Sequence, residues 1–467
     1  MSRRVDLLVV GAGPAGMAAA ITACQHGLDV LVVDEQPAPG GQIWRNVEKV
    51  CRTPRAAWLG TSYTEGAEAV ARFRASGAAY EPQTQVWQVE PGPRAYMTRA
   101  GVASMVEASC LLLATGAQER PVPFPGWTLP GVMTVGAAQI LLKSSGQIPD
   151  APVWIAGNGP LPLLYAAQLL KAGGRIAGFL DTTSPPRWAV GAARLLGAAF
   201  AAPREIGKGL AWLAALRLAD VRIIRGVTRI EALGSQALET LRYHNGSGTL
   251  VSVPASLLLV HEGIVPTIHP TLALGCTHRW DAAQMCFAPE IDEWGETSCA
   301  DIFVAGDGAG IGGAAAAGLR GTLAALRIAS RLGRLSPAEL NAAARSTRIR
   351  LRRALAPRSF LDALYGPRDD VLVPEDRTLV CRCEMVTASE IRAQVACGRP
   401  GPNQVKAFTR AGMGPCQGRQ CAYTVAHILA EAEGRAVPEL GLYRARPPLK
   451  PLTIGELAAL DVTGGSG

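Results

Sequence analysis

The most constraining feature of this sequence is the stretch VDLLVVGAGPAGMAAAITACQHGLDVLVVDE, residues 5–35. Its apolar residues 5–10 predict a buried strand, which leads directly into glycines with GxGxxG spacing. A helix is expected from residue 15 to about residue 25, and a second strand over residues 30–33. A glycine motif framed by strand, helix and strand in this order is typical of a Rossmann-type dinucleotide-binding unit.

Each glycine of the motif has its own physical task in such a unit. Gly11 permits the tight turn, Gly13 lets the backbone approach a pyrophosphate, and Gly16 allows the helix to pack closely on the strand. The helix N-terminus offers unpaired amides and a positive dipole end to the phosphates. Asp34 is placed to accept ribose hydroxyls, and Glu35 is the adjacent alternative. The predicted dinucleotide-contacting residues of this turn are Gly11, Gly13, Pro14, Ala15, Gly16, Asp34 and Glu35.

A second stretch, APVWIAGNGPLPLLYAAQLLKAGGRIAGFLD, repeats the strand, turn, helix and strand layout with Gly157, Gly159 and Asp181. The third motif position is Pro162, which the first helical turn tolerates but which removes the close packing of a glycine. No basic residue directly follows Asp181, so a 2′-phosphate has no evident partner, and NAD or another adenine nucleotide such as ATP is favoured over NADP. A degenerate site retained only for architecture is an equally open alternative.

A third glycine-rich turn lies in CADIFVAGDGAGIGG, where a strand over residues 302–305 ends in Gly306 and Asp307. A carboxylate at such a turn can accept a hydrogen bond from a polyol. Two further apolar strands end in loops, in the segments LLLATGAQERPVPFPG and LLLVHEGIVPTIHP. We interpret these two segments as the crossings into and out of an inserted domain.

These motifs and their order resemble the flavoproteins with paired dinucleotide-binding domains, to which thioredoxin reductase and glutathione reductase belong. The resemblance covers residues 1 to about 335 and implies FAD on residues 1–118 and 265–335, with a nucleotide-binding domain inserted at residues 119–264. It places the segment PAPGGQIWR under the flavin phosphates. The residues that it adds to the expected FAD site are Gly41, Gln42, Val86, Ala114, Thr115, Gly116, Gly306 and Asp307.

The sequence lacks what a disulfide reductase of that group needs. No CxxC or Cx4C pair stands at a flavin-proximal position, and no paired histidine and glutamate base is legible. A dithiol substrate is therefore not expected, and the sequence predicts no catalytic residue.

Four cysteines form the pattern CxC, thirty-two residues, then Cx4C, at Cys381, Cys383, Cys416 and Cys421. Four thiolates can hold a [2Fe–2S] cluster or a structural zinc ion. CxC spacing strains a zinc knuckle, which has about two to four residues between its cysteines. The glycines around the second pair also suit a loop whose amides point at sulfur. The cluster is therefore favoured over zinc, and zinc over four unconnected thiols.

Residues 378–434 resemble the small [2Fe–2S] domain of bacterioferritin-associated ferredoxin and of assimilatory nitrite reductases. The second cysteine pair departs from their usual CxxC by two extra residues. Within this segment, VTASE predicts a helix opened by a capping box of Thr387 and Glu390. The Pro-rich tail, residues 435–467, has too few apolar residues for a domain. Surface packing of the tail is preferred over draping across the body or a partner.

An FAD unit with a nucleotide-like insertion, followed by CRCE and GPCQGRQC, resembles the α subunits of heteromeric dehydrogenases. This group includes opine oxidases, hydrogen cyanide synthase, and amine or D-hydroxyproline dehydrogenases, and the resemblance spans nearly the whole chain. It implies an electron-transfer subunit whose partner, a second flavoprotein similar to D-amino acid oxidase, oxidises an amino acid, opine or imino acid. It also allows an FMN at a subunit interface and a small third subunit.

The predicted fold class is α/β, with two Rossmann-like domains of the glutathione reductase type. A helical linker over residues 336–377 and a small helical [2Fe–2S] domain follow. Two other functions are open alternatives. One is a self-contained NADH-dependent reductase that passes electrons through FAD to the cluster, and the other is a non-catalytic iron–sulfur docking module whose flavin is structural.

Composition argues against several other classes of protein. An odd count of 11 cysteines without an export signal argues against a disulfide framework. The net charge of +8 is compatible with nucleic acid, but the arginines are largely scattered and no nucleic-acid motif is present. No uninterrupted run of about eighteen apolar residues predicts a transmembrane segment. We therefore expect a cytoplasmic protein, with membrane association through partners left open.

Overall fold

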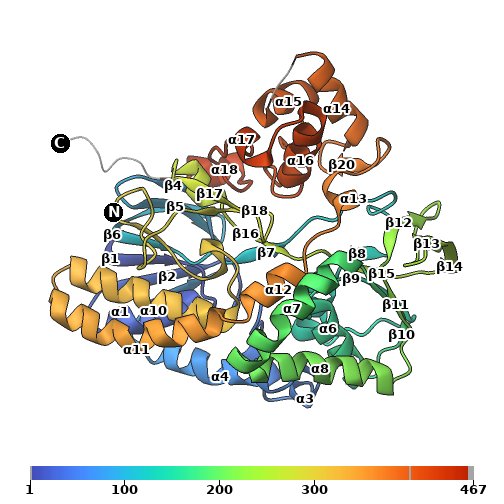
Figure 1. Ribbon diagram of the computed structural model, residues 1–467. Helices are drawn as coiled ribbons and strands as arrows, with labels where there is room; N and C mark the ends of the chain where they lie inside the picture. Colours follow the sequence, from blue (N-terminus) through green and yellow to red (C-terminus); the bar gives the residue numbers. More distant parts are fainter. Residues whose placement is uncertain (1–2, 399–400, 461–467) are drawn as a thin grey trace.

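The computed structural model describes residues 3–398 and 401–460. Residues 1–2 of the first predicted domain, 399–400 of the predicted cluster domain and 461–467 of the predicted tail lie outside the described residues. Figure 1 shows two α/β units side by side and a smaller helical unit above them.

The first α/β unit is built on a seven-stranded sheet in the order β3-β2-β1-β6-β5-β4, with β19 also paired to β6. The pairings among β3, β2, β1, β6 and β19 are parallel, whereas β4, β5 and β6 form an antiparallel meander. Because β6 and β19 are far apart in the chain, this sheet is completed only after the inserted unit. Its strands are β1 (Arg3–Val10), β2 (Val30–Asp34), β3 (Ala79–Pro82), β4 (Thr84–Glu90), β5 (Arg94–Arg99), β6 (Val102–Leu113) and β19 (Ile302–Val304).

Small side chains let two helices lie close together on this sheet. α1 (Pro14–Gln25) contacts α10 (Ala314–Arg331), and both are rich in alanine and glycine. A Cβ on Gly321 of α10 would lie 2.1 Å from the carbonyl oxygen of Ala15, so only glycine permits this approach. The other helices of the unit are α2 (Val47–Val50), α3 (Ala56–Leu59), α4 (Thr61–Arg74) and α11 (Pro337–Leu355), the last packed on α10.

The second α/β unit has a five-stranded parallel sheet in the order β11-β10-β9-β15-β8. Its strands are β8 (Val132–Thr134), β9 (Val153–Gly157), β10 (Ile176–Asp181), β11 (Ile223–Arg225) and β15 (Leu258–His261). Its helices are α5 (Val135–Ser145), α6 (Pro160–Lys171), α7 (Pro185–Ala201) and α8 (Pro203–Leu218). β12 (Thr228–Leu233), β13 (Thr240–His244) and β14 (Leu250–Pro254) form an antiparallel meander beside this sheet.

Two short strands mark the crossings between the units. β7 (Ala117–Glu119) and β16 (Ile264–Pro266) pair antiparallel, so the two crossing segments lie side by side. Nearby elements are α9 (His269–Ala273), the hairpin of β17 (His278–Asp281) and β18 (Cys286–Pro289), and the 3-10 turn η1 (Gly306–Ala309).

The C-terminal unit is small and helical, and it has its own apolar core. α12 (Arg358–Leu364) and α13 (Asp369–Leu372) lead to the hairpin of β20 (Leu379–Cys381) and β21 (Val386–Thr387). α14 (Ala388–Ala396), α15 (Pro402–Thr409), α16 (Ala422–Glu433), α17 (Val437–Leu440) and α18 (Ile454–Ala458) follow. The core includes Val380, Ile391, Val425 and Ile428. Thr387 and Glu390 form the predicted capping box at the start of α14.

These elements confirm the predicted α/β class with two Rossmann-like units followed by a small helical one. Within residues 3–398 and 401–460, no helix combines the length and apolar character needed to cross a membrane.

Candidate functional site

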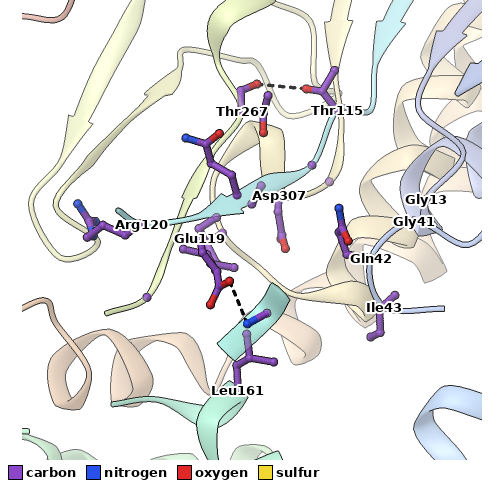
Figure 2. Close-up of a pocket in the computed structure, with 18 of the residues that line it drawn as sticks. Gly13, Gly41, Gln42, Ile43, Thr115, Glu119, Arg120, Leu161, Thr267 and Asp307 are labelled. Carbon is purple, nitrogen blue, oxygen red and sulfur yellow. Dashed lines mark hydrogen bonds between the residues drawn. The ribbon is translucent and has the colours of Figure 1, made fainter. Parts of the chain in front are cut away.

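A cavity of about 1160 Å³ lies where the two α/β units and the C-terminal unit meet. In Figure 2, Gly41 and Gln42 lie on one side of it, and Glu119 and Arg120 lie on the other. Pockets for drug-sized ligands measure roughly 300–1000 Å³. This cavity is therefore large enough for a dinucleotide.

Most residues predicted to contact FAD line this cavity. They are Gly11, Gly13, Pro14, Ala15, Asp34, Glu35, Gly41, Gln42, Val86, Ala114, Thr115, Gly116, Gly306 and Asp307. Gly16 does not line it and packs against the protein instead, because a Cβ there would lie 1.8 Å from the carbonyl oxygen of Gly11. That contact is the close helix-to-strand packing predicted for the third glycine.

The first glycine-rich turn fits the pyrophosphate of a dinucleotide. Gly11 has a φ of +109°, and its Cβ would lie 2.4 Å from the carbonyl oxygen of Ala114, so the protein itself requires glycine there. A Cβ on Gly13 would meet no protein atom closer than the Cα of Gly41 at 3.8 Å. Protein packing therefore does not demand a glycine at position 13. The space left beside the N-terminus of α1 is the room that a bound phosphate needs.

Asp34 ends β2 at the cavity wall. Its Oδ2 accepts a hydrogen bond from the Ala12 amide at 2.5 Å, and its Oδ1 accepts one from the Gln36 amide at 2.7 Å. Burial raises the pKa of Asp34. A carboxylate has about four lone-pair sites, so acceptor capacity remains for ribose hydroxyls. Glu35 also lines the cavity, but its carboxylate forms an ion pair with Lys450 from the C-terminal tail.

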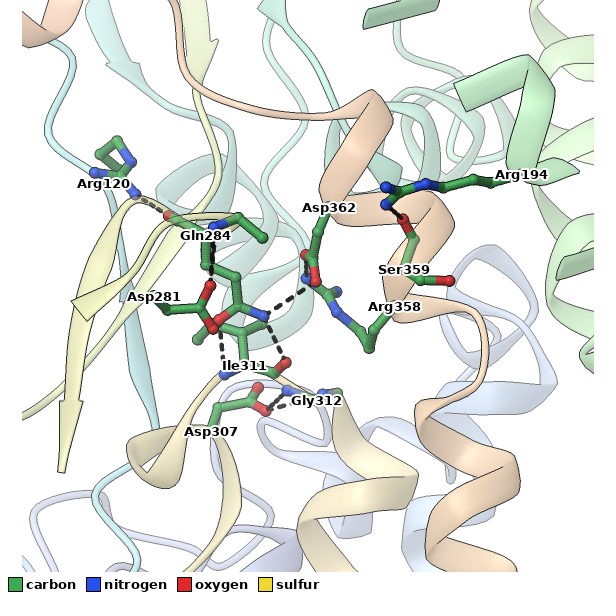
Figure 3. A network of polar contacts seen from close by, with 12 residues as sticks. Arg120, Arg194, Asp281, Gln284, Asp307, Ile311, Gly312, Arg358, Ser359 and Asp362 are labelled. Carbon is green, nitrogen blue, oxygen red and sulfur yellow. Dashed lines mark hydrogen bonds and ion pairs between the residues drawn. The ribbon is translucent and has the colours of Figure 1, made fainter. Parts of the chain in front are cut away.

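Asp307 is held at the start of α10 by backbone amides. Its Oδ1 accepts hydrogen bonds from Gly312 at 2.8 Å and Gly313 at 2.9 Å, while Oδ2 has no partner among the described residues. Figure 3 shows the surrounding network, in which Gln284 joins the β17–β18 hairpin to the loop before α10 and to Asp362 of α12. The turn is therefore held by the β17–β18 hairpin and by the backbone amides before α10. Oδ2 of Asp307 is left to accept a hydrogen bond from a polyol hydroxyl.

The second glycine-rich turn has different surroundings. Asn158 and Gly159 line the cavity, but Gly157 and Asp181 do not. Burial raises the pKa of Asp181. Burial, and next the neighbouring charge of Asp181, raise the pKa of Tyr365 to about 12. A tyrosine from the linker after the first unit therefore lies near the acid that would accept a nucleotide ribose.

Residues 365–368 of that linker also cover the ends of the neighbouring strands. Asn158 donates a hydrogen bond from Nδ2 to the carbonyl oxygen of Gly366 at 2.9 Å. Arg368 donates from Nε to Glu262 at 2.7 Å, and these two side chains are only 7% and 1% exposed. A nucleotide in a Rossmann unit lies outside the carboxyl ends of these strands. The residues here do not fit a dinucleotide whose ribose reaches Asp181.

The four predicted ligand cysteines gather in the C-terminal unit as two pairs. Cys381 lies next to Cys421, and Cys383 lies next to Cys416. Cys381 and Cys421 are buried, whereas Cys383 is exposed and Cys416 is half-buried. Among the residues that the structure describes, no three His, Cys, Asp or Glu side chains converge as a single metal ion requires. Two separate pairs are the arrangement that two iron atoms, each with two thiolates, would use.

Glycines shape the loops around these cysteines. A Cβ on Gly414 would lie 2.2 Å from the Cβ of Cys383, and one on Gly412 would lie 2.5 Å from a tyrosine ring. A hydrogen bond from Cys421, helped by backbone amides that include Gly412, lowers the pKa of Cys381 to about 6 against the opposing effect of burial. Amides directed at sulfur stabilise thiolate and tune iron–sulfur clusters.

The cysteine loops border the same cavity as the glycine-rich turns. Arg382 lies between Cys381 and Cys383 in the chain, Arg419 and Gln420 lie between Cys416 and Cys421, and all three line the cavity. Gln118 of β7 donates to the carbonyl oxygen of Arg419 at 2.8 Å. The crossing strand and the second cysteine loop are thus joined at the cavity wall.

The C-terminal tail lies across the first sheet. The Leu449 amide donates to the carbonyl oxygen of Trp87 at 2.6 Å, and Arg419 donates to the carbonyl oxygen of Leu449 at 2.8 Å. Leu449 and Lys450 line the cavity near Glu35. The described part of the tail therefore drapes over the body, which differs from the preferred expectation of simple surface packing.

A buried histidine–glutamate pair was not predicted. Oε1 of Glu119 lies 2.7 Å from Nδ1 of His261, and both residues line the cavity. The expectation that no such pair exists is corrected by this contact. The two residues stand in the two crossing segments, GAQER and VHEGI, so the pairing of those segments was the one clue available in the sequence.

A buried lysine on the same wall was not predicted either. Lys143 of α5 donates from Nζ to the carbonyl oxygen of Gln42 at 3.0 Å and to Gln139 at 2.9 Å. Burial lowers the pKa of Lys143 to about 7. The residue therefore ties the glycine-rich segment of the first unit to a helix of the second.

Comparison with known proteins supports this architecture. A protein-family model described as pyridine nucleotide-disulphide oxidoreductase matches residues 5–331. The chain belongs to this family. A second model, the sarcosine oxidase A3 domain, matches residues 375–461, the part that carries the paired cysteines.

Members of this family that resemble the chain along most of its length are named as subunits. The A subunit of opine oxidase from Agrobacterium tumefaciens strain Ach5 is 44% identical over 98% of this chain and 92% of its own length. The HcnB subunit of hydrogen cyanide synthase from Pseudomonas aeruginosa is 34% identical over 95% of this chain and 96% of its own. The family and these relatives identify the chain as an FAD-dependent oxidoreductase of the heteromeric flavin dehydrogenase group.

A solved structure supports the fold over almost the whole chain. L-proline dehydrogenase from P. horikoshii superposes with a TM-score of 0.71 and 21% sequence identity, over 98% of this chain and 80% of that one. At this level of identity the likeness concerns the fold alone.

Proposed function

We propose that this chain is the electron-transfer flavoprotein subunit of a heteromeric dehydrogenase. The observation that carries the proposal is the shared cavity. The dinucleotide-binding turns line one part of it, and Arg382, Arg419 and Gln420 from between the paired cysteines line another. Redox groups on two sides of one cavity can exchange electrons without passing through bulk solvent.

Two cofactors follow from this arrangement. FAD would be held by the glycine-rich turn at Gly11 and Gly13, by Asp34 and by Asp307, and it would supply both two-electron and one-electron chemistry. A [2Fe–2S] cluster would be held by the two cysteine pairs. Zinc is less well supported, because among the described residues no three of these side chains converge as one tetrahedral group requires. The proposal also includes an FMN at a subunit interface, which the family resemblance allows.

The substrate chemistry is proposed to lie on a partner. The relatives named above are subunits of an opine oxidase and of hydrogen cyanide synthase. By analogy, a second flavoprotein subunit similar to D-amino acid oxidase would oxidise an amino acid, opine or imino acid, with a small third subunit in addition. We propose a cytoplasmic location, which subcellular fractionation of cells expressing the tagged chain can test.

The decisive experiment is purification of the tagged chain from its native cells. Visible spectra, iron and acid-labile sulfide assays and electron paramagnetic resonance of the dithionite-reduced eluate are then recorded. We expect a co-purifying oxidase-type flavoprotein, about two irons per chain, and loss of iron in Cys381→Ser but not in the control Cys24→Ser. A chain that carries zinc or no metal, or that co-purifies with no flavoprotein, would contradict the proposal.

The NADH-dependent alternative is tested on the isolated chain. The cover of residues 365–368 over the second turn argues against NADH entry at Asp181. Anaerobic mixing with NADH should therefore leave the flavin absorbance unchanged over minutes. Rapid bleaching would instead favour a self-contained reductase, and a flavin that dithionite cannot reduce would favour a docking module.

A further inference from the structure

Glu119 and His261 form a buried pair that neither cofactor site explains. Glu119 ends β7 and His261 ends β15, and Oε1 lies 2.7 Å from Nδ1. Their side chains are 15% and 5% exposed. Oε2 of the same glutamate accepts a hydrogen bond at 2.9 Å from the Gly136 amide at the start of α5, drawn as a dashed line in Figure 2. The carboxylate is thus fixed at both oxygens and sets the orientation of the ring.

The other ring nitrogen is available to the cavity. Nε2 of His261 has no hydrogen-bond partner among the described residues, and His261 lines the cavity. A carboxylate on Nδ1 fixes the proton on that nitrogen and leaves the lone pair on Nε2. An orienting carboxylate, an imidazole and open space beyond it form the arrangement used in general acid–base chemistry.

The pair is linked through α5 to the segment expected to pass under the flavin phosphates, which lies on the other side of the cavity. Lys143 of α5 donates to the carbonyl oxygen of Gln42 at 3.0 Å, and Gly136 at the other end of α5 donates to Glu119. All four residues line the cavity together with His261. One helix therefore connects the glycine-rich segment to the histidine.

Electron transfer between the proposed cofactors requires a proton carrier. A flavin exchanges protons together with electrons, whereas an iron–sulfur cluster accepts electrons alone. Protons released in a partly closed cavity therefore need a route of their own. His261 lines this cavity, its ring is oriented by a carboxylate, and its Nε2 has no hydrogen-bond partner among the described residues.

We propose that His261 carries protons between the cavity and solvent during each redox cycle, with Glu119 as its positioning residue. The inference rests on the function proposed above. A bound FAD would supply the redox chemistry. When its electrons leave singly for the proposed cluster, Nε2 of His261 would accept the proton that the flavin releases, and on reduction it would return one. The Glu119 carboxylate would face the imidazolium, and water would exchange its proton.

Few charged groups surround this histidine. The strands β8 and β9, which flank β15, carry none. α5 contributes Lys143, and the end of β7 contributes Glu119 and, after it, Arg120. Glu262 follows His261 in the chain, but its charge is matched by Arg368. The main electrostatic partner of the imidazole is therefore Glu119.

The alternative is that the Glu119–His261 contact only holds the two α/β units together. Kinetics can distinguish this role from proton transfer. The intact FAD-loaded chain is reduced anaerobically and mixed with ferricenium, a one-electron oxidant that takes no proton. In the wild-type protein, the rate of flavin reoxidation should rise with pH as the imidazole becomes neutral. His261→Gln should lower this rate by about 100-fold at the plateau and abolish its pH dependence.

Glu119→Gln should lower the plateau rate too, by less than His261→Gln does, because the lost carboxylate no longer orients the ring with Nε2 toward the cavity. The matched control is His278→Gln, because His278 is half-buried, bonded to Thr271 and Cys276, and absent from the cavity wall. It should leave both rate and profile unchanged.

A wild-type rate and profile in FAD-loaded His261→Gln would overturn the proposal. Should that variant fail to retain FAD, an unchanged plateau rate in Glu119→Gln would overturn it as well. These readouts need only the flavin. Zinc in the cysteine site or a missing partner would defeat the proposed function without changing the effect of the His261 and Glu119 variants.

Discussion

The two glycine-rich turns, at Gly11 and at Gly157, have similar local sequences and different surroundings. Each follows a buried parallel strand, precedes a helix and begins with a glycine of positive φ, +109° in the first and +150° in the second. Asp34, after the first turn, borders the cavity, whereas Asp181, after the second, does not border it and lies near Tyr365. The comparison teaches that the motif specifies a turn, and that more distant chain segments decide whether a ligand can reach it.

The third motif position separates the turns further. Gly16 allows α1 to approach the carbonyl of Gly11, whereas Pro162 stands at the equivalent place in the first turn of α6. α1 therefore packs closely on the strand before it, whereas α6 does not depend on a glycine at this position.

The largest expected effect comes from breaking that close packing. In Gly16→Val, even the Cβ would lie 1.8 Å from the Gly11 carbonyl oxygen. We expect a loss of about 4 kcal/mol or more in the free energy of unfolding, together with loss of bound FAD. Urea denaturation and the flavin absorbance of the purified protein measure both. Pro162→Val, the matched change in the second turn, should cost less than about 1 kcal/mol, and equal losses would show that the turns are packed alike.

The next largest effect is expected at residues 365–368, which contact the second glycine-rich turn. Arg368→Met would leave Glu262 buried and unpaired, so the free energy of unfolding should fall by about 3–5 kcal/mol. The double variant Arg368→Met/Glu262→Gln should recover most of this loss, because no buried charge is left without a partner. Chemical denaturation of both variants gives the coupling energy. A single variant within about 1 kcal/mol of the wild type would mean that the pair does not hold the cover in place.

A smaller effect compares the two acids directly. Asp34→Ala removes the carboxylate at the cavity wall and should weaken FAD binding by about 10- to 100-fold, the range of a hydrogen bond to a charged group. Asp181→Ala should leave FAD affinity unchanged, because Asp181 does not line the cavity. Fluorescence titration of the apoprotein with FAD measures both. Similar weakening in the two variants would place the acids in equivalent roles.

The smallest effect concerns the tail that closes the first site. Lys450→Ala removes the ion pair with Glu35, whose side chain is 41% exposed, so solvent screens much of the interaction. We expect FAD release to accelerate by less than about fivefold, with a smaller difference between variant and wild type at high salt. Stopped-flow dissociation at two salt concentrations tests this. An acceleration that does not depend on salt would point to lost packing in place of lost charge.

Much of the fold was predictable because its determinants are local. The strand before Gly11, the helix after it and the capping box of Thr387 and Glu390 each depend on a few consecutive residues. Gly11 was expected to permit a tight turn and Gly16 to allow close packing of helix on strand, and the positive φ of Gly11 and the close approach at Gly16 agree with both. The spacing of the four cysteines likewise indicated one site, and the structure brings them together as two pairs.

The remaining features depend on residues far apart in the chain. Nothing near Asp181 indicated that Tyr365 and Gly366 would cover its strand end, and nothing near Glu119 indicated a contact with His261. The sequence alone determined the turns, the strands and the helix starts, because steric limits and hydrogen bonds within a few residues set them. Tertiary packing determined which turn faces the cavity and which side chains pair, because burial and charge compensation act between segments that meet only in the folded chain.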